Sequence, residues 1–175
     1  MPDYRFIDKV SAAANLTANA LVVGDDGAKG IKALALGAAN LKLFMNAAGT
    51  ANEYASGITI TTFTRDTATA SGDQAITGVG FKPSNAIFIA TVNDSAGRMS
   101  IGLDNGTAKL TMIDYYNTTA NTYYIVNTKS IYIDDGAGVR YSGLISALGA
   151  DGCTITWTRE GEPTGTITVA AIFFR

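Results

Sequence analysis

The sequence of 175 residues contains no histidine and a single cysteine. Histidine is the usual general base and a common metal ligand, so its absence excludes Ser-His-Asp and Cys-His nucleophilic sites. Cys153 has no partner for an intrachain disulfide. It alternates with Ile155 and Trp157, and we expect it to be a buried apolar side chain. Stability must therefore come from packing, either alone or together with association between chains.

Charge is also scarce. Charged residues make up 16% of the chain, and 13 basic against 15 acidic residues give a net charge of -2. No window forms a Lys/Arg stripe, so we do not expect a nucleic acid partner. The apolar stretch Ala33 to Phe44 is interrupted by Gly37, Asn40 and Lys42, so we expect no membrane insertion. Met1 to Val10 lacks the basic start and apolar core of a secretory signal, and we expect synthesis without one.

The chain is rich in apolar residues, which make up 47%, and in glycine, with 19 residues in turn-like settings. A change in composition falls near Gly57. Residues 11–56 are rich in Ala, Asn, Gly, Leu and Thr and have too few bulky side chains to form a core alone. We therefore expect residues 1–56 to be an extended segment for oligomerisation, whose apolar side chains pack against copies of the chain. Within it, Ile31 to Asn46 fits short extended pieces or a helix of about three turns.

From Ile58 onward, β-branched and aromatic residues alternate with polar ones, which is typical of strands. Turn signals such as Ser71-Gly72-Asp73 and Asp104-Asn105-Gly106 separate the runs at short spacing. This pattern predicts an all-β fold, an antiparallel β-sandwich or jelly roll, over residues 57–175. The predicted strands are Ile58–Thr64, Ala86–Val92, Met99–Leu103, Ala108–Ile113, Tyr123–Val126, Ile131–Asp134, Tyr141–Ala147, Cys153–Arg159 and Thr166–Phe174.

Two groups of segments resemble bacteriophage proteins. Leu21 to Tyr54 resembles N-terminal or shaft segments of phage tail fibres. Gly72 to Pro83, which reads GDQAITGVGFKP, then Ala86 to Ala90, and Ala150 to Arg175 look like the C-terminal β domain of phage fibre and virion proteins. Together they cover somewhat less than half of the chain.

The resemblance implies a homotrimer on the virion surface, made in the host cytoplasm. Its N-terminal segment would attach to another virion protein, and its β domain would be displayed for recognition of the host surface. Because the shaft-like stretch is short, the resemblance implies a short tail fibre or spike, or else a capsid decoration or head-fibre protein. A free carbohydrate-binding lectin is an alternative of a different class.

Carboxylates are the remaining candidates for catalysis, since a facing pair can cleave glycosides. Most of them flank turns, where a carboxylate ordinarily accepts hydrogen bonds from backbone N–H groups. We therefore expect no enzymatic activity, no catalytic residue and no cofactor. Asp134-Asp135-Gly136 and Asp25-Asp26-Gly27 lack the spacing of known calcium loops, so no metal site is assigned. The carboxylates considered are Asp104, Asp114, Asp134, Asp135, Asp151, Glu160 and Glu162.

Tyrosines interspersed with asparagines form the candidate binding site. Tyrosine rings stack on sugars, and neighbouring amides bind hydroxyl groups. Adjacent tyrosines in a strand point to opposite faces, so at least one of each pair is expected to pack in a core or a subunit contact. The predicted receptor-binding residues, for a host-surface glycan or protein, are Tyr115, Tyr116, Asn117, Asn121, Tyr123, Tyr124 and Tyr132.

Overall fold

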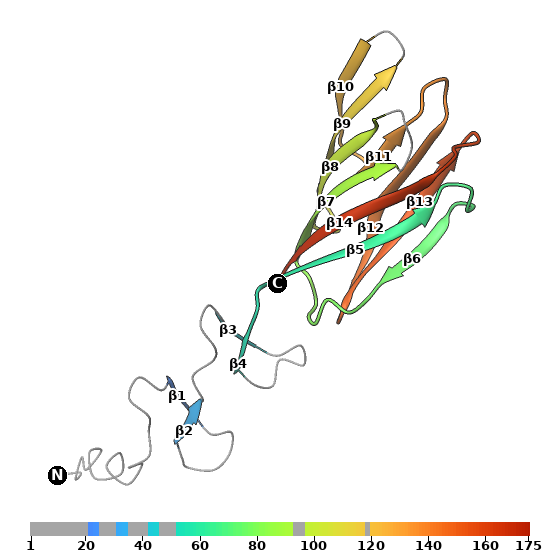
Figure 1. Cartoon of the computed structure of the whole chain (residues 1–175). Coiled ribbons are helices and arrows are strands. Elements are labelled where there is room, and N and C mark those ends of the chain that lie inside the picture. The colour runs from blue at the N-terminus through green and yellow to red at the C-terminus, as the bar shows by residue number, and fades with distance from the viewer. Residues whose placement is uncertain (1–20, 25–30, 35–41, 46–51, 93–96, 118–119) are drawn as a thin grey trace, which may run out of the picture. The chain divides into compact units, whose positions relative to one another are not determined.

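A computed structural model describes residues 21–24, 31–34, 42–45, 52–92, 97–117 and 120–175. It divides the chain into two units, Met1–Ser56 and Gly57–Arg175. Each unit is a separate arrangement of strands, shown in Figure 1.

The described residues of the first unit form two short antiparallel strand pairs. Strand β1 (Leu21–Gly24) pairs with β2 (Ile31–Leu34), and β3 (Lys42–Met45) pairs with β4 (Asn52–Ala55). The alternative of a helix across Ile31 to Asn46 is wrong for β2 and β3, which are strands; the residues between them lie outside the described part. The extended reading is the one that the described residues follow.

The second unit contains ten strands in two antiparallel sheets (Figure 1). One sheet has six strands in the order β10-β9-β8-β7-β14-β5, and the other has four in the order β11-β12-β13-β6. The six are β5 (Ile58–Asp66), β7 (Asn85–Val92), β8 (Met99–Asp104), β9 (Lys109–Asn117), β10 (Ala120–Val126) and β14 (Thr166–Phe174). The four are β6 (Gly72–Ile76), β11 (Ile131–Asp134), β12 (Arg140–Gly149) and β13 (Gly152–Glu160).

The hydrophobic core lies between these sheets and follows the strand period of two. In β7, Ala86, Phe88, Ala90 and Val92 are buried while the residues between them are more exposed. Phe88 meets Phe63 and Phe173 edge to face, with ring centroids 6.4 and 6.1 Å apart. The prediction of an all-β antiparallel sandwich is confirmed.

Trp157 and Cys153 lie in this core, as the sequence predicts, and are 1% and 4% exposed. The Trp157 ring stacks on Tyr141 at 5.3 Å, and its indole N–H donates to Gln74 Oε1 at 2.9 Å. Burial raises the pKa of Cys153 to about 12, so its thiol is protonated at neutral pH. Cys153 is therefore a packing residue.

Buried polar side chains of the six-stranded sheet fix the four-stranded sheet in place. The Tyr132 backbone N–H donates to Ser100 Oγ, and the Thr111 hydroxyl donates to the Lys129 carbonyl. Asp104 is 2% exposed and accepts from the Ile145 N–H at 2.8 Å, where β12 carries a bulge. These bonds satisfy backbone groups that would otherwise be buried without partners.

Strand β6 was missed by the sequence prediction, because Ser71-Gly72-Asp73 has the composition of a turn. Gly78 and Gly80 follow β6 outside any strand, with φ of 80° and 84°, and their N–H groups donate to the Asp151 carboxylate. Left-handed backbone, which glycine adopts readily, explains them, since a Cβ at either position would meet nothing within 4 Å.

Candidate functional site

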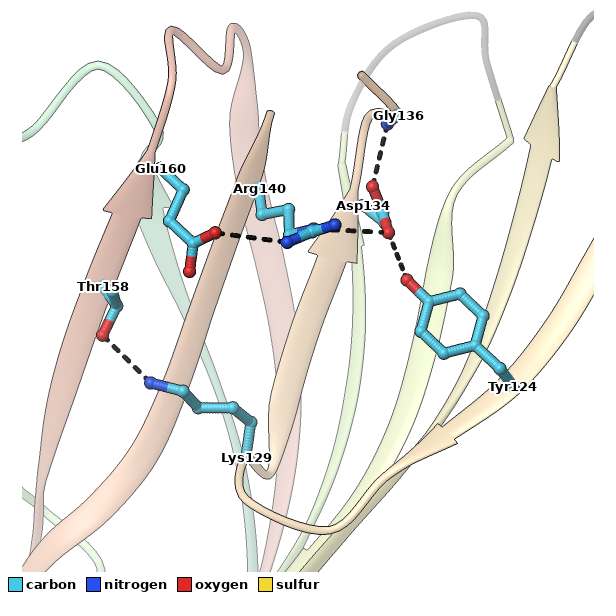
Figure 2. Close-up of polar contacts among 7 residues, drawn as sticks. All are labelled: Tyr124, Lys129, Asp134, Gly136, Arg140, Thr158 and Glu160. Carbon is cyan, nitrogen blue, oxygen red and sulfur yellow. Dashed lines mark hydrogen bonds and ion pairs between the residues drawn. The ribbon is translucent and has the colours of Figure 1, made fainter. Parts of the chain in front are cut away.

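Three of the predicted receptor-binding tyrosines gather where the β9–β10 hairpin passes the edge of β11. Tyr124 on β10 meets Tyr132 on β11 edge to face, with centroids 6.3 Å apart. The Tyr124 hydroxyl donates to the Asp134 carboxylate, a short contact drawn in Figure 2. Tyr115 lies against the β11–β12 turn, where a side chain at Gly136 would collide with its hydroxyl. These tyrosines join the two sheets at this edge.

A row of alternating charges begins at Asp134 and crosses the outer face of the four-stranded sheet. Asp134, Arg140 and Glu160 are directly opposite one another on β11, β12 and β13. Arg140 lies 3.7 Å from Asp134 and 3.4 Å from Glu160, and Asp134 also accepts from the Gly136 N–H (Figure 2). Cross-strand pairs of opposite charge stabilise a sheet modestly. Arg140 therefore bridges two carboxylates that would otherwise repel each other.

The ionisation of the two tyrosines follows from this setting. Burial, followed by the hydrogen bond to Asp134, raises the pKa of Tyr124 far above its usual value. Burial also raises the pKa of Tyr132. Both hydroxyls stay protonated at neutral pH, so they act as hydrogen-bonding groups rather than as bases.

The remaining predicted residues are not on this surface, or lie where side chains are not described. Tyr123 points to the opposite face of β10 from Tyr124 and is 69% exposed. Its cross-strand partner is Asp114. The adjacent pair is thus split between two faces, as the alternation of a strand requires. Tyr116, Asn117 and Asn121 belong to the β9–β10 hairpin, but their side chains lie outside the described residues.

The carboxylates considered for catalysis mostly hold the structure together. Asp104 and Asp151 accept backbone N–H groups, and the pKa of Asp151 is lowered by its bonds to Gly80 and Gly78. Asp135 pairs with Arg98 at 2.6 Å, and Glu162 pairs with Arg159. Among the described residues, no group of three or more His, Cys, Asp or Glu is placed to hold a metal ion.

A second surface was not foreseen from the sequence: the outer face of the six-stranded sheet is apolar. Large apolar side chains remain exposed on five of its six strands, including Ile60 at 70%, Ile125 at 62% and Met112 at 52%. The full set of exposed large apolar residues is Ile58, Ile60, Ile89, Met99, Leu103, Leu110, Met112, Tyr123 and Ile125. Solvated faces of antiparallel sheets normally carry polar residues, so this face is exceptional.

In the part of the chain that the structure describes, no helix is long and apolar enough to span a membrane. Comparison of the chain with protein-family models, with curated proteins and with solved structures finds no match.

Proposed function

We propose that this chain is a non-enzymatic structural protein of a bacteriophage virion. It acts as a homotrimeric short tail fibre or spike on the particle surface. Residues 1–56 attach it to another virion protein, and the β-sandwich of residues 57–175 is displayed for recognition of a host-surface glycan or protein.

The proposal of a non-enzymatic role rests on what the carboxylate and thiol side chains contact. Asp104, Asp134 and Asp151 accept backbone N–H groups, and Cys153 is a buried thiol with a raised pKa. A general acid or nucleophile must reach substrate, whereas these groups bind the protein's own backbone or lie in its core. This use of the reactive groups supports a role that depends on the surfaces of the domain.

The virion setting rests on the resemblance to phage fibre and virion proteins of Leu21–Tyr54, Gly72–Pro83, Ala86–Ala90 and Ala150–Arg175. The sandwich suits a displayed module, because buried side chains lock its two sheets together. It forms a unit distinct from Met1–Ser56. A rigid domain following a separate attachment segment is what a short fibre requires.

The location can be tested on particles. Antibodies against the sandwich, applied to purified phage that encodes this chain and viewed by electron microscopy, should label the tail. Labelling of the capsid would instead favour the decoration or head-fibre alternative. Particles that contain none of this chain by mass spectrometry would contradict the virion proposal altogether.

Glycan recognition has one specific structural observation in its favour: Tyr123 presents an exposed ring next to Asp114 across the strand pair. An exposed aromatic with an adjacent acceptor is a common way to bind sugars. Binding of the chain to host-surface glycans on an array should fall at least about tenfold in Tyr123→Ala, which is one lost stacking contact. Glycan binding unchanged by that substitution would place recognition elsewhere.

A further inference from the structure

The apolar outer face of the six-stranded sheet is continuous from one edge of the sheet to the other. Residues directly opposite each other across the strands form rows. One row runs from β9 to β5 through Leu110, Leu103, Ile87, Ile172 and Ile60. A neighbouring row runs from β10 to β5 through Ile125, Met112, Ile101, Ile89, Ala170 and Thr62.

Charge is absent from both rows. On this face, Asp114 lies in the next row toward the hairpin end, opposite Met99 and Tyr123. A centre that is depleted of charge and consists mainly of aliphatic residues, with Met112 among them, is typical of the core of a protein interface. The composition therefore matches a surface that is covered by protein.

The area is also that of a stable interface. Tyr123 lies beside Asp114, outside the two rows. The other eight large apolar residues are between 36% and 70% exposed. If each would expose on the order of 180 Å² when free, together they offer roughly 700 Å² of surface. The largest apolar patch of an ordinary monomer is about 300–600 Å², and a standard interface buries about 800 Å² per partner. This face exceeds the first value and is close to the second.

The outer face of the four-stranded sheet provides an internal reference. Its outward positions carry the charged row Asp134–Arg140–Glu160 and the threonines Thr154, Thr156 and Thr158. Both sheets belong to one sandwich and share one core, so overall composition does not explain the apolar face. The difference is specific to one side of the domain.

We infer that the outer face of the six-stranded sheet is the surface through which copies of this chain associate, the same face of each copy contacting its neighbours. The inference deepens the proposed function, because it places the contact between copies in the β-sandwich as well as in residues 1–56. Copies of the chain are the occupant that the area and composition fit, since a sugar or a small ligand would cover only a fraction of the face.

The test compares full-length variants by sedimentation velocity at about 10 µM, a concentration at which an obligate assembly stays intact. Met112→Lys and Ile60→Lys put a charge into the two apolar rows. Ala75→Lys puts the same charge on the outer face of β6, in the four-stranded sheet, and is the matched control. All three positions are exposed in the single chain, so each variant should fold, and the emission of buried Trp157 checks this.

We expect the unmodified chain and Ala75→Lys to sediment as the same oligomer. Met112→Lys and Ile60→Lys should dissociate toward 18.2 kDa, with dissociation constants raised about 100-fold or more by the desolvated charge. An oligomer that both substitutions leave intact would overturn the inference and would leave the proposed trimer, held by residues 1–56, in place. A monomeric unmodified chain would overturn both the inference and the trimer, while labelling of particles would still decide the virion setting.

Discussion

The two outer faces of the β-sandwich differ sharply although they enclose the same core. Across β11, β12 and β13, the outward positions carry Asp134, Arg140 and Glu160, which pair with one another. Across β9, β8 and β7, they carry Leu110, Leu103 and Ile87. An antiparallel sheet needs only one apolar face to form a sandwich. The sandwich itself therefore does not require the second apolar face.

The largest effect is expected from Trp157, which is 1% exposed in the core between the sheets. Trp157→Ala removes the stacking on Tyr141 and the bond to Gln74. We expect it to lower the free energy of unfolding by about 3–5 kcal/mol. Urea unfolding followed by circular dichroism measures this. A loss below about 1 kcal/mol would show that the core is not packed as described.

A smaller effect is expected from Ile101→Ala in the apolar face. Ile101 is only partly buried in the single chain, but in an assembly its side chain is covered, so we expect a loss of about 1–3 kcal/mol. The loss should appear as a lower unfolding midpoint, and because the chains associate, the midpoint should rise with protein concentration. The matched Thr154→Ala, on the polar outer face, should change stability by no more than about 0.5 kcal/mol. Equal losses of stability in the two variants would contradict the proposed difference between the two outer faces.

On the polar face, Arg140→Gln tests whether the charged row matters. The Arg140 side chain is 40% exposed, so salt screens much of its pairing with Asp134 and Glu160. We expect a small loss of stability at low ionic strength that disappears at about 1 M salt. Thermal unfolding at two salt concentrations measures it. A large loss that persists at high salt would mean that this face is also covered.

The smallest effect concerns pH. The N–H groups of Gly80 and Gly78 lower the pKa of Asp151 in the folded state, so the unfolded chain binds its proton more readily. Stability from this carboxylate is present above the usual pKa of aspartate and is lost as pH falls through the folded value. Asp151→Asn should therefore be less stable than the unmodified chain at pH 7, and the difference should shrink toward about pH 2. A difference that grows on acidification would contradict the assignment.

The sandwich could be predicted from the sequence because most of its strands alternate in the period of two. Cys153 and Trp157 were placed in the core on that basis alone. Strand β6 was missed because its recognition depends on a partner: Gly72–Ile76 becomes a strand by pairing with Cys153–Trp157, which is far away in sequence. Local composition there favours a turn.

The apolar face was missed for a related reason. Ala86–Val92 and Thr166–Phe174 contain apolar residues on both sides of the strand, so the pattern does not tell which side faces the core. Only the pairing order, which places β14 between β7 and β5, aligns Ile87, Ile172 and Ile60 in one row. Likewise, the sequence grouped seven residues as one receptor site, whereas the strand geometry puts Tyr123 and Tyr124 on opposite faces.

The central claim is that the apolar face is covered by other copies of this chain. The most direct measurement compares the masses of the unmodified full-length chain and of Met112→Lys in solution by size-exclusion chromatography with light scattering, at a few micromolar protein. The account predicts a mass of three times 18.2 kDa for the unmodified chain and a mass that falls toward 18.2 kDa for Met112→Lys. A trimeric Met112→Lys would contradict it, and so would an unmodified chain that is folded and elutes with the mass of a single chain, even at tenfold higher concentration.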